Sequence, residues 1–250
     1  MNMTKLSVNL NKVATLRNTR TIGIPSLTHA AHIALEAAAD GITLHPRPDE
    51  RHIRPDDIYE IAGLMRDYPD AELNIEGNPF HGLMQFANDV RPTQCTLVPD
   101  PPDVFTSDTG WKIAPNASAL RDVIAQLHEW GIRVSLFMDA DSDEWDHVAN
   151  IGADRVELYT EPYAALFANG TDQEIEASLG QFASAGNRAS TVGLRLNAGH
   201  DLNLDNLGPF LQAVDHVAEV SIGHALIADA LEYGLTETIR MYQAIIEEAS

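Results

Sequence analysis

Short apolar runs rich in β-type residues alternate with longer stretches of helical periodicity along the whole chain. The β-type runs begin near Leu6, Gly41, Glu72, Gln94, Arg133, Arg155, Gly193 and Val217. Between most of them, apolar residues recur at the spacing of a helix that buries one face. The clearest helical patterns cover residues 26–40, 55–68, 118–131 and 172–186. This alternation predicts parallel strands joined by helical crossovers.

The number of these units and the length of the chain favour a closed barrel. About eight strand–helix units in a chain of this length match a (β/α)8 barrel, which typically needs about 250 residues. An open doubly wound sheet is the structural alternative, and it predicts a G-x-G-x-x-G fingerprint after the first strand. The sequence contains no such fingerprint. We therefore predict an α/β protein in which residues 1–250 form a single (β/α)8 TIM barrel domain with additional helices.

Two local features refine this prediction. Several strands follow a helix that ends near a glycine, as in AADGITL, EWGIRVSLF and NIGADRVELY, and we expect the glycine to form the helix C-cap. The connections at residues 99–116 and 163–171 are longer than a minimal barrel needs. Both are candidates for extra elements or for lids over a site.

The composition narrows the class of protein. Hydrophobic residues make up 44% and charged residues 21% of the chain, as in ordinary globular proteins. No apolar run approaches the roughly 20 residues that span a bilayer, and the first twenty residues lack the apolar region of a signal peptide. The single cysteine, Cys95, cannot form an internal disulfide. These features predict a cytoplasmic protein.

The charge argues against polyanionic partners in general but leaves room for a local anion site. There are 37 acidic residues against 16 Lys and Arg, for a net charge of −21, which disfavours binding to nucleic acid or to an anionic membrane. Yet the segment TLHPRPDERHI, residues 43–53, gathers His45, Arg47, Arg51 and His52 directly after a predicted strand. Donors held by the two prolines of this segment suit a phosphate group.

A second anion site is indicated by the segments NAGHD and SIGHA. Gly199 and Gly223 end the seventh and eighth predicted strands. Loops after those strands, with a helix N-terminus, form the usual phosphate site of such barrels. Two anion sites at one barrel mouth imply a substrate pair with two phosphate groups.

Polar side chains follow nearly all the predicted strands, at the end where barrel enzymes place their chemistry. These strand-end residues include Asn9, Asn11, Lys12, His45, Glu76, Asp100, Asp139, Asp141, Glu157, Glu161, Asn197, His200 and His224. Each has an ordinary structural explanation when taken alone: a histidine can be hydrogen-bonded in the core, and a carboxylate can cap a helix. Their convergence on one rim favours an active site.

The sequence also disfavours metal and serine-nucleophile chemistry. His45 and His52 lack the spacing of zinc ligands, and the chain has neither an H-E-x-x-H motif nor clustered cysteines. No G-x-S-x-G elbow is present. The sequence thus predicts no metal site.

Eight segments together resemble a known family. They are VNLNKVATLRNTR, GITLHPRPDERHI, LNIEGNP, TLVPD, VSLFMDAD, ELYTEPYA, LRLNAGHDLN and VSIGHALIADAL. In order, and over essentially the whole chain, they are similar to the pyridoxine 5′-phosphate synthase family of bacterial vitamin B6 synthesis. The resemblance implies a homo-octamer that condenses 3-amino-2-oxopropyl phosphate with 1-deoxy-D-xylulose 5-phosphate. The implied products are pyridoxine 5′-phosphate, phosphate and water, with no metal or organic cofactor.

The resemblance also implies roles for individual residues. It implies that His45 and Glu76 accept protons and that His200 donates one. The implied contacts to the deoxyxylulose phosphate are Arg47, His52 and Thr106. The implied contacts to the amino-ketone phosphate are Asn9, Arg20, Gly223 and His224.

Two positions depart from the family pattern. A first-strand pair that often reads Asp-His is Asn11-Lys12 here, and the position after the seventh-strand histidine, usually Gly, is Asp201. We keep all three as substrate-binding candidates. Lys12 can supply a phosphate contact, and we expect the Asp201 side chain to turn outward so that only its N–H faces the anion.

Two other functions remain open at this point. A lysine at a barrel strand end can form a Schiff base, so Lys12 keeps open an aldolase or isomerase that acts on sugar phosphates. A non-catalytic barrel that binds vitamin B6 precursors is the second alternative. The presence of His45, Glu76 and His200 together argues against it.

Overall fold

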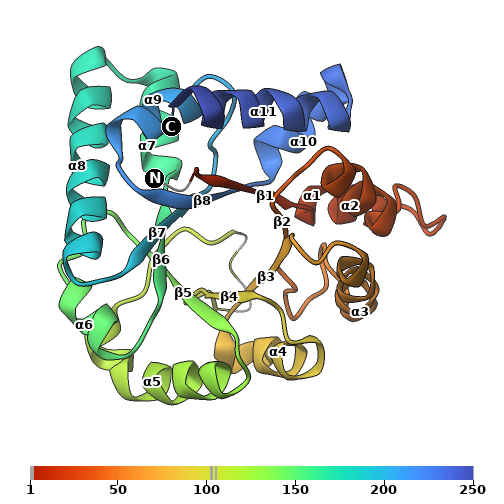
Figure 1. The fold of residues 1–250 in the computed structure, drawn as a ribbon, viewed down its shortest axis with the longest axis horizontal. Helices are drawn as coiled ribbons and strands as arrows, with labels where there is room; N and C mark the ends of the chain where they lie inside the picture. Colours follow the sequence, from red (N-terminus) through yellow and green to blue (C-terminus); the bar gives the residue numbers. More distant parts are fainter. Residues whose placement is uncertain (1–2, 102–103, 105, 250) are drawn as a thin grey trace.

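Eight parallel strands close into a barrel in the order in which they occur along the chain. The computed structural model describes residues 3–101, 104 and 106–249, and its barrel is shown in Figure 1. The strands are β1 (Lys5–Asn9), β2 (Gly41–Leu44), β3 (Glu72–Gly77), β4 (Gln94–Leu97), β5 (Arg133–Met138), β6 (Arg155–Tyr159), β7 (Arg195–Gly199) and β8 (Val217–Ile222). β1 pairs with both β2 and β8, which closes the ring. The predicted (β/α)8 TIM barrel is confirmed.

Helices surround the ring of strands. They are α1 (Asn11–Asn18), α2 (Leu27–Glu36), α3 (Pro55–Leu64), α4 (Met84–Val90), α5 (Ile113–Glu129), α6 (Trp145–Asn150), α7 (Glu161–Asn169), α8 (Asp172–Thr191), α9 (Leu207–Ala213), α10 (His224–Tyr233) and α11 (Leu235–Ala249). A 3-10 turn, Met65–Asp67, follows α3, and a π-type turn, Pro79–Leu83, precedes α4. Within the described residues, no helix is long and apolar enough to cross a membrane.

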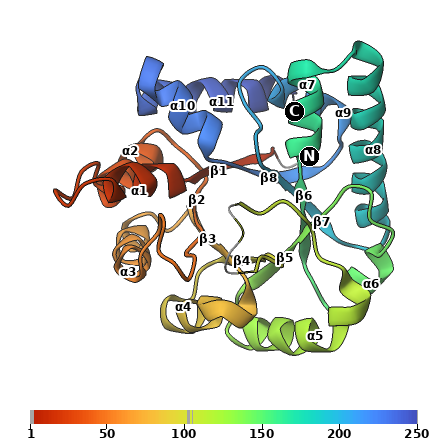
Figure 2. The same ribbon diagram turned by 180° about the vertical axis from the view of Figure 1, so that it is seen from behind.

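The additional helices come in pairs. Two helices, α1 and α2, lie between β1 and β2; α7 and α8 lie between β6 and β7; and α10 and α11 follow β8. Figures 1 and 2, which view the molecule from opposite sides, both show α10 and α11 beside α1 and α2. The predicted long connection at 163–171 is therefore mostly helix, since α7 buries Tyr163 against Phe182 and Phe210. The connection at 99–112 contains no helix or strand among its described residues.

The predicted glycine caps are correct in two of the three quoted segments. Gly131 and Gly152 have φ angles of 76° and 95° just after a helix. In AADGITL the prediction is wrong, because Ala38 takes the left-handed conformation (φ 67°) and Gly41 is the first residue of β2. Gly41 is required for a different reason: a Cβ atom there would lie 2.6 Å from the carbonyl oxygen of Glu72 on the neighbouring strand.

The period of two along each strand separates an apolar outer face from a polar inner face. In β3, Leu73 and Ile75 are buried among the apolar residues between the strands and the helices. The alternate residues Glu72, Asn74 and Glu76 belong to the inner face, as their polar contacts with other strands show. Burying a leucine or isoleucine stabilises the fold by roughly 1.5–3 kcal/mol, so this outer layer is the main source of stability.

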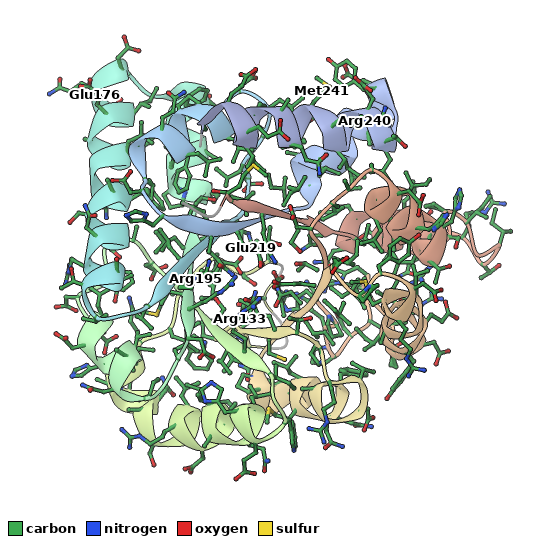
Figure 3. The ribbon with its side chains drawn as sticks, in the orientation of Figure 1. Arg133, Glu176, Arg195, Glu219, Arg240 and Met241 are labelled. Carbon is green, nitrogen blue, oxygen red and sulfur yellow. The ribbon has the colours of Figure 1, made fainter. Side chains whose placement is uncertain are left out.

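The amino-terminal end of the barrel is closed by a network of charged side chains. Glu72 pairs with Arg133 and, at 2.5 Å, with Lys5. Glu219 accepts hydrogen bonds from Arg155 at 3.3 Å and from Gln94 at 3.2 Å. Figure 3 shows Arg133 and Glu219 inside the ring of strands, whereas Glu176 and Arg240 point outward from helices. The side chains that face the barrel interior are therefore polar from this end up to the opposite mouth.

The close approach at Gly41 gives a test of strand packing. We expect Gly41→Ala to lower the free energy of unfolding by about 1–3 kcal/mol, because the new methyl group overpacks against a backbone oxygen. The control is Gly63→Ala, where a Cβ meets no atom within 4 Å in α3; removing a helical glycine should stabilise the protein by about 0.5–1 kcal/mol. Urea unfolding curves measure both. Equal effects of the two substitutions would contradict the packing constraint.

Candidate active site

His45 and Glu76 form a close pair at the carboxyl end of the barrel. Leu44 pairs with Ile75 across β2 and β3, so the next residues along the two strands, His45 and Glu76, lie side by side on the inner face. His45 Nδ1 lies 3.6 Å from Glu76 Oε2, and both side chains are more than 90% buried. The structure thus brings together two residues that the sequence separates by a helix.

Burial shifts the pKa values of both residues of this pair away from those of free side chains. Burial, followed by the charges of Arg47 and His52, holds the pKa of His45 well below its usual value. Burial, followed by the charges of Glu219 and Asp100, raises the pKa of Glu76. Near neutral pH the pair therefore combines a neutral imidazole with a carboxyl group that holds a proton unusually well.

His200 follows β7 in a fixed and strained conformation. Its φ angle is 82°, and the Thr160 hydroxyl donates to the carbonyl oxygen of His200 at 2.5 Å. The imidazole ring packs against Phe137 and Tyr159, with both ring centroids 5.2 Å away. Left-handed backbone is costly for a non-glycine residue, so these contacts hold a conformation that the local sequence alone does not favour.

The pKa of His200 reflects opposing influences. Burial lowers it, the carboxylates of Asp201 and Asp100 raise it, and Arg47 lowers it; the net shift is downward. His200 also contributes to the lowered pKa of His45, which places the two imidazoles in one electrostatic environment. Asp201 itself is exposed.

Arg47 and His52 lie buried beside the pair. Arg47 donates to Asp100 at 2.6 Å. The rings of His52 and His45 are 6.1 Å apart. Burial, with the charges of Arg47 and Lys12, lowers the pKa of His52 to about 4. Since His52 Nδ1 accepts the N–H of Ile53, Nε2 carries the proton of the neutral ring and can donate it to a ligand.

The loop that carries His52 is anchored to α1. Arg17 forms a buried ion pair with Asp57, at the start of α3. The carbonyl oxygen of His52 accepts hydrogen bonds from Arg17 at 3.2 Å and from Asn18 at 2.8 Å. These contacts fix the residues between β2 and α3 without using the groups that face the barrel mouth.

The first-strand loop supports His45 from the other side. Asn9 Oδ1 accepts the N–H of Asn11, and Asn11 Oδ1 accepts the N–H of His45, both at 3.0 Å. A Cβ at Gly223 would come within 3.1 Å of the Asn9 side chain, so this position has little room for a larger residue. Lys12 is half-buried in the first turn of α1.

Three predicted contacts lie on the surface. Arg20, Thr106 and His224 are exposed, and no hydrogen bond or ion pair joins their side chains to another residue in the described part of the chain. The structure therefore brings ten of the thirteen predicted residues to the mouth or its immediate support. Asp201, although exposed, is one of the ten because its charge acts on His200.

Two buried carboxylates were not among the predicted site residues. Glu157 lies on the inner face of β6, where Thr96 donates to it at 3.3 Å; burial and the charges of Glu76 and Glu219 raise its pKa well above the usual value. A Cβ at Gly199 would lie 2.6 Å from Glu157 Oε1. Asp100 pairs with Arg47. Both residues were recognised as strand ends, but only the structure shows that they touch the site.

The described residues contain no group of three or more His, Cys, Asp or Glu side chains placed to hold a metal ion. A groove of about 450 Å³ lies outside the barrel, lined by residues of α3, of α4 and of the segment between them, and by residues 91–93 after α4. It contains none of the predicted site residues.

Comparison with known proteins gives a family for the chain. The family described as "Pyridoxal phosphate biosynthesis protein PdxJ" matches residues 6–248. A protein named pyridoxine 5′-phosphate synthase from Albidiferax ferrireducens is 57% identical over 250 residues, covering 98% of each chain. A protein of the same name from Porphyromonas gingivalis is 48% identical over 241 residues, covering 96% of this chain and 98% of that one.

Solved structures share the fold at low sequence identity. A tryptophan synthase from M. tuberculosis has a TM-score of 0.61 at 13% identity, covering 98% of this chain and 94% of that one. A phosphoribosyl anthranilate isomerase from Thermus Thermophilus has a TM-score of 0.57 at 11% identity, covering 98% of this chain and all of that one. These similarities support the barrel fold alone.

The position of Asp201 predicts a measurable effect on His200. Replacing Asp201 by Asn removes a negative charge that favours the imidazolium, so the pKa of His200 should fall. Asp205→Asn, on the same loop, makes the same charge change and is the control. Titration of the histidine ring signals by NMR, assigned with His200→Gln, reports both. An unchanged pKa in Asp201→Asn, or an equal fall in Asp205→Asn, would count against this electrostatic coupling.

Proposed function

The chain belongs to the PdxJ family of pyridoxal phosphate biosynthesis proteins, and we propose on this basis that it is a pyridoxine 5′-phosphate synthase. Its substrates are 3-amino-2-oxopropyl phosphate and 1-deoxy-D-xylulose 5-phosphate. Its products are pyridoxine 5′-phosphate, inorganic phosphate and water. The observation that carries the proposal is the buried His45–Glu76 pair, 3.6 Å apart, in one barrel mouth with His200 and the cationic Arg47.

The reaction needs acid help when the two substrates join. The amine nitrogen of one substrate attacks the ketone carbon of the other, and the carbonyl oxygen must leave as water. We assign His200 as the proton donor to that oxygen. This role requires the imidazolium, which Asp201 and Asp100 favour and which burial and Arg47 oppose. With these opposing charges, the His200 imidazolium holds its proton weakly and can donate it to the reacting oxygen.

Ring closure needs bases. Protons must leave carbon atoms next to the carbonyl or imine group, and His45 and Glu76 are the acceptors in the proposal. The lowered pKa of His45 keeps its ring neutral and able to accept. The raised pKa of Glu76 makes its ionised form a stronger base than an ordinary carboxylate. At 3.6 Å, the two groups are close enough to exchange a proton after a small movement.

Glu157, on the inner face of β6, supports the same chemistry. It is buried, and burial together with the charge of Glu76 raises its pKa, so it keeps its proton more readily than an ordinary carboxyl group. We assign it the role of holding a proton near the developing charge. Thr96 and Asn74 connect it by hydrogen bonds to the polar interior of the barrel.

Phosphate groups are held at two flanks of the mouth in this proposal. Arg47 and His52, with Thr106 from the rim, bind the deoxyxylulose phosphate. Asn9, Gly223 and the start of α10 at His224, with Arg20, bind the other phosphate. Lys12 and the N–H of Asp201 are further anion contacts, and Asn11 holds the backbone of His45.

The two alternative functions receive less support. Lys12 affects the electrostatics of His52, as expected of a phosphate contact, and the substrate already supplies the amine for imine formation. A non-catalytic barrel does not account for three buried groups with shifted pKa values at one mouth.

A homo-octamer and a cytoplasmic location remain predictions from the sequence. Exposed apolar side chains at Leu16, Ile22 and Ile24 lie on α1 and the segment before α2, and they support self-association through this part of the surface.

The proposed function is tested by turnover with the substrate pair. Wild-type protein should form pyridoxine 5′-phosphate and release phosphate, and Glu76→Gln should lower kcat by about a hundred- to ten-thousand-fold, as expected for loss of a general base. Glu176→Gln, on the exposed face of α8 (Figure 3), is the matched control and should keep full activity. Absence of product from the wild-type protein would refute the proposal.

The raised pKa of Glu76 predicts the pH dependence of the reaction. Activity that needs ionised Glu76 falls as the pH drops through that raised pKa, so the acid limb of kcat should lie above the range of an ordinary glutamate, about pH 4.3. His45 has a lowered pKa and stays neutral in this window. Enzyme held at each pH and assayed again at neutral pH controls for denaturation. A rate that stays flat down to about pH 5 would contradict the assignment.

A further inference from the structure

Arg47 is fixed by the segment that connects β4 to α5. Its guanidinium donates to the carboxylate of Asp100 at 2.6 Å, to the hydroxyl of Ser107 at 3.4 Å and to the carbonyl oxygen of Val104 at 3.2 Å. The side chains of Arg47 and Asp100 are only 5% and 7% exposed. A buried ion pair of this kind restrains a side chain that otherwise has several rotatable bonds.

Asp100 is itself held in place by residues on both sides. Its Oδ2 atom accepts a second hydrogen bond, from the Ser107 hydroxyl at 2.5 Å. Its carbonyl oxygen accepts from the side-chain amide of Asn78 at 3.1 Å, and Asn78 directly follows β3. The carboxylate is therefore anchored to the barrel as well as to its own connection.

These contacts leave some of the guanidinium N–H donors of Arg47 available to a ligand. An arginine has five N–H donors, and the three bonds above use three of them. Thr106, the proposed hydroxyl contact of the same phosphate, is the residue before Ser107. The Asp100 carboxylate therefore binds Arg47 directly and holds the Thr106 segment through Ser107.

We propose that Asp100 is a positioning residue for the deoxyxylulose phosphate site: it holds the Arg47 guanidinium, and through Ser107 the Thr106 segment, in the orientation that receives the phosphate. This inference rests on the proposed function, because Arg47 is the phosphate ligand in it. Asp100 acts through Arg47 and does not itself touch the substrate.

The flexibility of the Arg47 side chain favours a positioning role for Asp100 over simple charge balance. Without the carboxylate, the long Arg47 side chain is free to change rotamer, and phosphate binding must then supply the cost of ordering it. The Asp100 charge by itself repels a phosphate, so its removal acts in the opposite direction. The sign of the change in affinity therefore decides between an orienting partner and a competing anion.

The decisive variant is Asp100→Asn, which keeps the shape of the side chain and a hydrogen-bond acceptor. Steady-state kinetics should show a KM for 1-deoxy-D-xylulose 5-phosphate raised about tenfold, the loss expected for one charge-assisted hydrogen bond. The KM for 3-amino-2-oxopropyl phosphate and kcat should change far less. Ser107→Ala keeps the ion pair and should raise the same KM by a smaller factor.

The matched control is Asp108→Asn, which removes the same charge from an exposed position in the same connection. It should leave both KM values unchanged. A lower KM in Asp100→Asn would show a competing anion and overturn the proposal. So would a KM equal to that of the wild type or of the Asp108 variant, or a loss shared equally by both substrates and kcat.

A binding measurement separates this inference from the proposed function. Calorimetric titration of each variant with 1-deoxy-D-xylulose 5-phosphate alone needs no turnover, and the dissociation constant should rise about tenfold in Asp100→Asn. If the wild type turns over but the Asp100 variant binds normally, the positioning role fails and the enzyme assignment stands. If the wild type binds but forms no product, the enzyme assignment fails, and the binding comparison still decides the role of Asp100. If Asp100→Asn does not fold, Ser107→Ala decides the outcome.

Discussion

Closure of eight parallel strands forces their inward-facing side chains into one shared space with little water, and in this chain those side chains are polar. Every other property of the site depends on that constraint. Burial away from water disfavours charge, so histidines lose protons and carboxyl groups keep them, as for His45 and Glu76. A neutral base and a protonated acid then coexist 3.6 Å apart. On an exposed surface the glutamate would be ionised at neutral pH, and the histidine would titrate at about pH 6.5.

The buried cations of the barrel are each backed by a carboxylate. Arg47 pairs with Asp100 at the mouth and Arg155 with Glu219 near the other end, while Arg17 pairs with Asp57 beneath the His52 loop. A chain of net charge −21 can nevertheless offer a phosphate site, because the position of a cation matters more than the total charge. Charge on the outer surface is screened within about 8 Å at physiological salt, whereas a cation held in the mouth acts on the ligand directly.

The sequence predicted most of the strands and the residues at their ends. It could not show the exact ends of some strands or the partners of the strand-end residues. The seventh strand begins at Arg195 and not at Gly193, because Gly193 has φ 86° and bonds back to Ser190 at the end of α8. The extra element that the sequence allowed at residues 163–171 is α7, which is held by Tyr163 packing against aromatic rings of other helices. Asp100 and Glu157 were recognised as strand ends, but their partners Arg47 and Thr96 are distant in sequence.

The sequence by itself determined the order of strands and helices, the face of each strand that carries polar groups, and the set of residues at the carboxyl ends. These follow from local periodicity, which each segment carries alone. Only the tertiary structure decided which of those residues touch and which protonation states they take. Segments distant in sequence are joined by His45 beside Glu76, His200 against Phe137 and Tyr159, and Arg47 against Asp100. Such contacts, and the burial that shifts the pKa values, arise only when the barrel closes.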